Sequence, residues 1–140
     1  PSKEENGKIF INGGSINGVI AHEDYEGIKN DDGDVFISGG TIRILANGNG
    51  SRGIQTDGNM TITADAGNTN IYVEANGGLC TDPADSVDPH RCMGIKVGQN
   101  LTITGGTIQV KATGNKARQI RVNGVYSNTG GTVDAIISQP

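Results

Sequence analysis

Short runs of alternating apolar and polar residues, each broken by a pair of glycines, recur along the chain. The clearest two are residues 36–44 (FISGGTIRI) and 102–110 (TITGGTIQV), with an earlier copy at 10–16 and a reduced one at 128–133. The glycine pairs begin at positions 13, 39, 105 and 130, so the steps are 26, 66 and 25, and the long step holds two periods and an insertion. Alternation predicts strands, and repetition every ~25 residues predicts a solenoid of stacked units.

A second recurring pair, glycine followed by isoleucine, predicts a third short strand in each repeat. It stands at residues 27–28, 53–54 and 94–95, and Gln119–Ile120 takes the last place. Each repeat has one predicted strand before the glycine pair and one after it, and the glycines supply the backbone freedom for a sharp corner between these two strands. Together these patterns predict an all-β protein, a right-handed parallel β-helix of about five coils with a period of about 25 residues. Residues 1–140 are expected to form a single domain with residues 76–93 as an inserted loop, and the chain fits a segment of a longer surface protein.

The composition argues against two classes of partner. The chain has 11 Lys and Arg against 15 Asp and Glu, a net charge of −4, and contains no basic run. We therefore expect no nucleic-acid partner. No apolar stretch approaches the ~18 residues of a membrane span, so we expect no membrane insertion.

The two cysteines, Cys80 and Cys92, both lie in the inserted loop. This spacing suits a disulfide that closes the loop, which would contribute about 3 kcal/mol through the unfolded state. The alternatives are two free thiols or half of a metal site, although no second cysteine pair supports a metal. A disulfide would predict an extracellular or cell-surface location.

An acidic loop, residues 22–34, holds six carboxylates in 13 residues. Calcium takes six to eight oxygen ligands, so a loop of this kind is a candidate site for it. The carboxylates that flank the predicted third strand are the candidate calcium ligands: Asp24, Glu26, Asp31 and Asp32. The alternative is a solvated acidic turn without a metal.

Two rows of outward side chains are candidate ligand-binding positions. The residue after each glycine–isoleucine pair would stack about 5 Å from its counterpart in the next repeat, which gives the row Lys29, Gln55, Lys96 and Arg121. Stacked cations repel one another unless an anion bridges them, so this row could bind a linear polyanion. The alternative is that these charges block edge pairing and keep the protein soluble. Phe10 and Phe36 lie in the first strands of two adjacent repeats and would form an exposed pair able to pack on the apolar face of a sugar.

The repeat resembles a known family when its two motifs are read together. Residues 26–28 (EGI), 37–42 (ISGGTI) and 103–108 (ITGGTI) resemble the repeats of bacterial carbohydrate-binding domains of the pectate-lyase-like right-handed β-helix type. The resemblance implies a secreted or cell-surface protein that binds acidic polysaccharides such as polygalacturonate, with calcium at carboxylate clusters. Asp24 and Glu26 match the acidic position before glycine–isoleucine, whereas later repeats carry Arg52, Met93 and Arg118 there.

We therefore expect non-catalytic binding of an acidic polysaccharide along one face of the protein, with or without help from calcium. The alternative is a structural or assembly module, such as a stalk, adhesin or filament subunit, that associates with itself through its unpaired ends. A polysaccharide lyase would need a base such as Lys29 beside Asp31 and Asp32. The short chain leaves no long loops to build a cleft for one, so we expect no enzyme.

Overall fold

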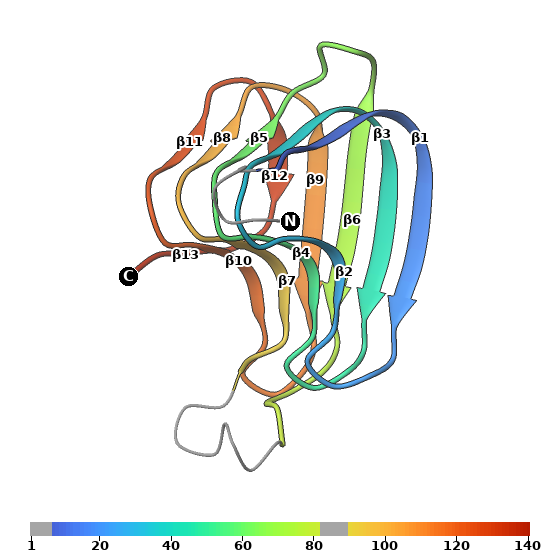
Figure 1. Cartoon of the computed structure of the whole chain (residues 1–140), viewed down its shortest axis with the longest axis vertical. Coiled ribbons are helices and arrows are strands. Elements are labelled where there is room, and N and C mark those ends of the chain that lie inside the picture. The colour runs from blue at the N-terminus through green and yellow to red at the C-terminus, as the bar shows by residue number, and fades with distance from the viewer. Residues whose placement is uncertain (1–6, 82–89) are drawn as a thin grey trace.

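The computed structural model describes residues 7–81 and 90–140. This part of the chain is built from strands, turns and loops (Figure 1). It includes no helix of the length and apolarity needed to cross a membrane. The strands are β1 (Ile9–Ile20), β2 (Glu26–Asn30), β3 (Val35–Ala46), β4 (Arg52–Thr56), β5 (Met60–Ile62), β6 (Thr69–Ala75), β7 (Met93–Val97), β8 (Leu101–Ile103), β9 (Thr107–Ala112), β10 (Arg118–Val122), β11 (Tyr126–Asn128), β12 (Thr132–Asp134) and β13 (Ile137–Ser138).

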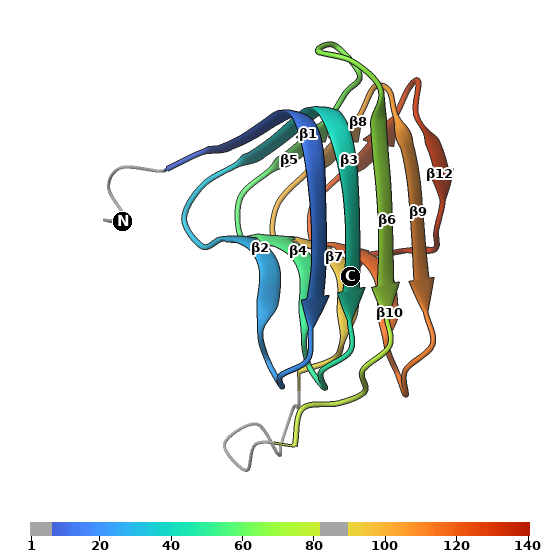
Figure 2. The ribbon, with the colours of Figure 1, turned by 90° about the vertical axis from the view of Figure 1, so that its right-hand side faces the viewer.

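The strands form two sheets, and all strand pairs within them are parallel. One sheet has eight strands in the order β11–β8–β5–β3–β6–β9–β12, with β1 paired to β3, and the other has five in the order β13–β10–β7–β4–β2. Figure 2 shows the strands of each sheet side by side. Successive repeats therefore lie next to one another, as the repeated sequence predicts.

The predicted right-handed parallel β-helix of about five coils is wrong. In β1 and β3 the chain passes through the glycine pair without leaving the sheet, so residues expected in two separate strands belong to one strand of 12 residues. The first half of β3 pairs with β5 and its second half with β6. This pairing joins eight strands into one sheet, which curls into a half-barrel (Figure 1). Two parallel sheets thus replace the predicted coils of three separate strands.

In β1 and β3 the glycine pairs bend the sheet instead of ending its strands, whereas the pairs at 105–106 and 130–131 separate β8 from β9 and β11 from β12. Gly14 and Gly40 have φ angles of +81° and +100°, a region that glycine enters without steric cost. The N–H of Gly40 still donates to the carbonyl of Asn68, at 2.9 Å. Because the backbone stays hydrogen-bonded through the bend, the chain changes direction within one sheet.

Aliphatic side chains from the two sheets fill the space between them. Ile54, Ile95 and Ile120 stand opposite one another in β4, β7 and β10 and are completely buried. The eight-stranded sheet contributes similar rows, such as Ile42, Ile71 and Ile108. Rows of one side-chain type suit a narrow core, because each residue meets a neighbour of the same size.

The glycines before Ile54 and Ile95 lie where side chains of the other sheet leave no room for a Cβ atom. A Cβ atom on Gly53 would lie 2.5 Å from Cγ1 of Val73 and 2.7 Å from the carbonyl oxygen of Gly94. A Cβ atom on Gly94 would lie 2.2 Å from Cγ1 of Val110. The recurring glycine is thus a requirement of packing between the sheets as well as a feature of the strand.

The cysteines of the inserted loop do not form the predicted disulfide. Leu79 and Arg91 form an antiparallel bridge, which sets Cys80 opposite His90 and Cys92 opposite Gly78. The two cysteines are therefore offset by two residues along the hairpin, and diagonal positions lie farther apart than a disulfide allows. The Cys92 thiol instead donates to the carbonyl of Ala46, at 3.3 Å, and burial raises the pKa of this thiol.

We predict that Gly53→Ala destabilises the protein by about 1–3 kcal/mol, the usual range for overpacking a core. The added methyl group would clash with Val73 and with backbone that cannot move independently. Gly13→Ala is the matched control, since a Cβ atom there meets nothing within 4 Å. Urea denaturation of the two variants measures the difference, and equal midpoints would contradict the packing role of Gly53.

Candidate functional site

The outward face of the five-stranded sheet carries the row predicted from the sequence. Lys29 pairs with Gln55, Gln55 with Lys96 and Lys96 with Arg121 across β2, β4, β7 and β10. We call these four residues the cationic row. Neighbouring strands lie about 4.8 Å apart, so the four positions span about 14 Å. The structure thus brings all four residues into one line.

Exposure changes along the cationic row. The side chain of Lys29 is 40% exposed, whereas Gln55 is only 6% exposed although it lies on the outward face. Lys96 and Arg121 are half-buried. The Oε1 atom of Gln55 is buried and has no hydrogen-bond partner among the described residues. A buried acceptor without a partner lowers the stability of the folded protein.

Arg52 is a member of this face that the sequence analysis did not select. It pairs with Glu26 across β2 and β4 and is only 5% exposed. Its Nη1 atom lies 3.6 Å from Glu26 Oε1 and 3.7 Å from Asp24 Oδ1, while its buried Nε has no hydrogen-bond partner among the described residues. The signal was present in the sequence, because arginine stands there in place of the acidic residue of the repeat.

Lys96 is the least compensated charge of the cationic row. Burial lowers the pKa of Lys96, and the positive charges of Arg52 and Arg121 lower it further. Asp57 and Glu26 oppose these effects, but the net pKa remains below the usual value. No ion pair joins Lys96 to a carboxylate in residues 7–81 and 90–140.

Lys29 is in the opposite situation at the end of the row. Its Nζ lies 3.5 Å from Glu26 Oε1 and 3.4 Å from Asp31 Oδ1. Burial alone would lower the pKa of Lys29, but these two carboxylates together outweigh it and raise the pKa. A lysine held protonated in this way is a good cation and a poor base.

The structure does not gather the candidate calcium ligands into one cluster. Asp24 and Glu26 both face Arg52, and Asp31 faces Lys29. The backbone N–H of Asp32 donates to the side chain of Asn30. Among the described residues, no group of three or more acidic, histidine or cysteine side chains is placed to hold a metal ion.

Polar contacts fasten the described ends of the inserted loop beside this face. His90 Nδ1 lies 2.8 Å from Oδ1 of Asp24. The backbone N–H and the hydroxyl of Thr81 both donate to the carboxylate of Glu23, the hydroxyl at 3.0 Å. Asp24 adopts a φ of +60°, in the left-handed region that aspartate enters more often than most other non-glycine residues.

A groove on the eight-stranded sheet contains the other predicted pair. The rings of Phe10 and Phe36 are stacked, with centroids 5.0 Å apart and planes 11° from parallel, and Phe10 is 61% exposed. The groove has a volume of about 300 Å³, and the residues that line it also include Asn12, Ser38, Thr61, Thr63 and Asp65. The structure therefore places the two aromatic residues together, on a different sheet from the cationic row.

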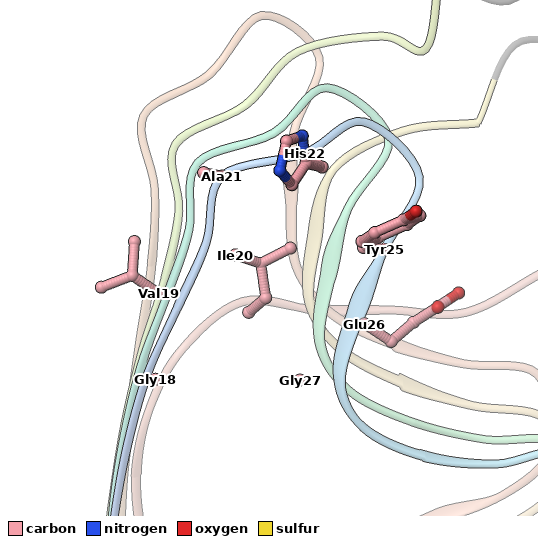
Figure 3. Close-up of a pocket in the computed structure, with 8 residues that line it drawn as sticks. All are labelled: Gly18, Val19, Ile20, Ala21, His22, Tyr25, Glu26 and Gly27. Atoms are coloured by element: carbon pink, nitrogen blue, oxygen red, sulfur yellow. The ribbon is translucent and has the colours of Figure 1, made fainter.

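A further hollow of about 280 Å³ lies between the ends of β1 and β2. Figure 3 shows Ile20 pointing into it, whereas the carboxylate of Glu26 points away. The ring of His22 lies 5.7 Å from that of Tyr25 at its rim. With an apolar floor and its one carboxylate turned outward, this hollow is the exposed end of the core.

A comparison with protein families gives one match to this chain. The family model, described as carbohydrate-binding domain-containing protein, matches residues 3–139. Neither the curated proteins nor the solved structures contain a match. The expectation of a carbohydrate-binding domain is confirmed at this level.

We predict that Lys96→Met raises the free energy of unfolding at neutral pH, because it removes a charge that burial and repulsion disfavour. The pKa of Lys96 in the folded protein lies below 10.5, the usual value for a lysine, so between these two values the unfolded state binds more protons and stability rises with pH. The advantage of the variant should therefore be full below the folded pKa of Lys96 and fade toward pH 10.5.

Urea denaturation at several pH values checks this prediction. Lys111→Met is the control, since Lys111 is an exposed cation on β9 of the other sheet. A Lys96 variant that is less stable than the unmodified protein at neutral pH would show that Lys96 is already compensated.

Proposed function

The chain belongs to the family of carbohydrate-binding domain-containing proteins, and on this premise we propose that it binds a polysaccharide with carboxylate groups along the cationic row. The observation that carries the proposal is the combination of unsatisfied groups on one face. Arg52 Nε is a buried donor and Gln55 Oε1 a buried acceptor, each without a partner among the described residues. An acidic sugar offers both complements, a carboxylate to accept and hydroxyl groups to donate.

The arrangement of charges supports a linear ligand. Lys96 and Arg121 are adjacent in the row, so one carboxylate can contact both. Hydrogen bonds between ionised partners are about twice as strong as neutral ones, and arginine can hold a carboxylate through two parallel contacts. A negative charge here would also offset the repulsion that lowers the pKa of Lys96.

We propose that the module binds without catalysis. A lyase needs a neutral base near the sugar carbon that loses its proton. Lys29, the residue considered for that role, has a raised pKa because of Glu26 and Asp31. It is therefore suited to hold a carboxylate and unsuited to remove a proton.

Location and calcium stay predictions. An acidic polysaccharide is met outside the cell, so we propose an extracellular or cell-surface location. Calcium takes six to eight oxygens, and an ion at Asp24 and Glu26 would have to compete with Arg52. We therefore propose that calcium, where it takes part, adds to binding by the cationic row.

A second candidate function is assembly with other copies of the chain. β1 is the last strand at one end of the eight-stranded sheet and exposes Phe10, Ile16 and Val19. Val125 and Ile136 are exposed near the last strands at the other end. An unpaired parallel strand can dock another edge. Oligomers that grow with protein concentration, and that Lys96→Met leaves unchanged, would favour this function.

We predict that polygalacturonate binds the protein in EDTA and that Lys96→Met weakens binding about tenfold, or about 1.4 kcal/mol. The reason is the loss of one charge-assisted contact at the centre of the row. Isothermal titration calorimetry measures the affinity. Methyl-esterified polygalacturonate, which lacks the charges, should bind more weakly than the acid form.

Lys111→Met is again the control, because it makes the same change in net charge on the other sheet. Equal losses in both variants would mean that only net charge matters and would contradict a site at the cationic row. Binding that requires calcium would shift the proposal to the acidic loop. Absence of binding both with calcium and with EDTA would overturn the proposal.

A further inference from the structure

We propose that the step between Phe36 and Thr61 on the eight-stranded sheet is a second carbohydrate-binding subsite, which holds one uncharged sugar ring. The proposal rests on the family membership but not on the cationic row, because the two sites lie on different sheets and have different chemistry. The step is formed by side chains of β3 and β5 and by the corner that follows β5.

The register of the strands creates the step. Phe10, Phe36 and Thr61 stand side by side in β1, β3 and β5, and Thr102 follows in β8. The ring of Phe10 stacks on one face of Phe36. On the other side the row drops from a ring to a short threonine, so the second face of Phe36 is open above Thr61.

The corner between β5 and β6 forms a wall beside this step. In Figure 1 it rises beyond the neighbouring corners of the sheet. This is the repeat without a glycine pair, and residues 64–68 take its place. Asp65, in this corner, lines the groove with Thr61 and Thr63.

The groove combines an apolar wall with a polar rim, as a pyranose ring requires. The C–H face of a sugar can pack on an aromatic ring while its hydroxyl groups point to the rim. The Ser38 hydroxyl donates a hydrogen bond to Oδ1 of Asn12 at 2.7 Å, and Thr63 Oγ1 accepts one from the backbone N–H of Asp65 at 3.2 Å. The Thr61 hydroxyl and the Asp65 carboxylate make no hydrogen bond with other described residues, so both can contact sugar hydroxyls.

The charge of the groove selects an uncharged ring. Asp65 is the one charged residue among those that line it. A uronate would bring its carboxylate close to this carboxylate and be repelled, whereas a neutral sugar donates hydroxyl hydrogens to it. The groove and the cationic row therefore favour opposite kinds of sugar.

The test is an NMR titration of the ¹⁵N-labelled chain with three neutral probes: cellohexaose, xylohexaose and mannohexaose. We expect at least one of them to shift the amide signals of Thr61, Thr63 and Asp65. Thr61→Phe should weaken that binding at least tenfold, because a third stacked ring would fill the step without removing any core group. Phe36→Ala should also weaken this binding, because it removes the aromatic ring on which the sugar packs.

Two controls separate this site from others. Thr102→Phe adds the same ring one strand farther along the row, outside the groove, and should leave binding unchanged. Lys96→Met should also leave it unchanged, so failure of the polygalacturonate experiment and failure here are distinguishable. The proposal is overturned if none of the probes shifts these amides, or if Thr61→Phe binds as well as the unmodified chain. It is also overturned if the groove amides broaden with protein concentration alone, which would mean that a second copy occupies the groove.

Discussion

In-register parallel pairing is the constraint on which both the core and the surface depend. Each residue lies about 4.8 Å from the equivalent residue of the next repeat, on the same side of the sheet. Inside, this produces rows such as Ile54, Ile95 and Ile120, which pack without large changes in volume. Outside, the same geometry forces Lys96 and Arg121 together although their charges repel. The register that gives the protein its core therefore also sets the cost of its charged face.

That cost is an argument for function. A half-buried lysine with a lowered pKa and two buried polar atoms without partners reduce the stability of the folded protein. A ligand that supplies a negative charge and hydroxyl donors recovers this free energy only when it binds. Such a face is less stable when empty and gains more from binding than a surface that satisfies its own groups, as Glu26 and Asp31 do for Lys29.

The sequence was sufficient to predict that the repeats form strands, which repeats are neighbours and which side chains line up in the two outward rows, because these follow from periodicity alone. It was not sufficient to predict how the rows are grouped into sheets. A glycine pair permits either a corner that ends a strand or a bend within a strand. At Gly40 the strand bends and continues, because the N–H of Gly40 still donates to the carbonyl of Asn68. The disulfide failed for a similar reason, since the separation of Cys80 and Cys92 in sequence does not reveal their diagonal offset in the hairpin.

Arg52 and the groove beside Phe36 show where repeat-based reasoning loses information. Both are places where one repeat differs from its neighbours: Arg52 replaces an acidic residue, Thr61 replaces a ring, and residues 64–68 replace a glycine pair. In a protein built from parallel neighbours, a departure in one repeat is placed directly against the standard residue of the next. Arg52 thereby meets Glu26, and Thr61 exposes one face of Phe36. A strict repeat would give uniform rows with no hollow, so the irregular positions are the ones able to form a site with a defined shape.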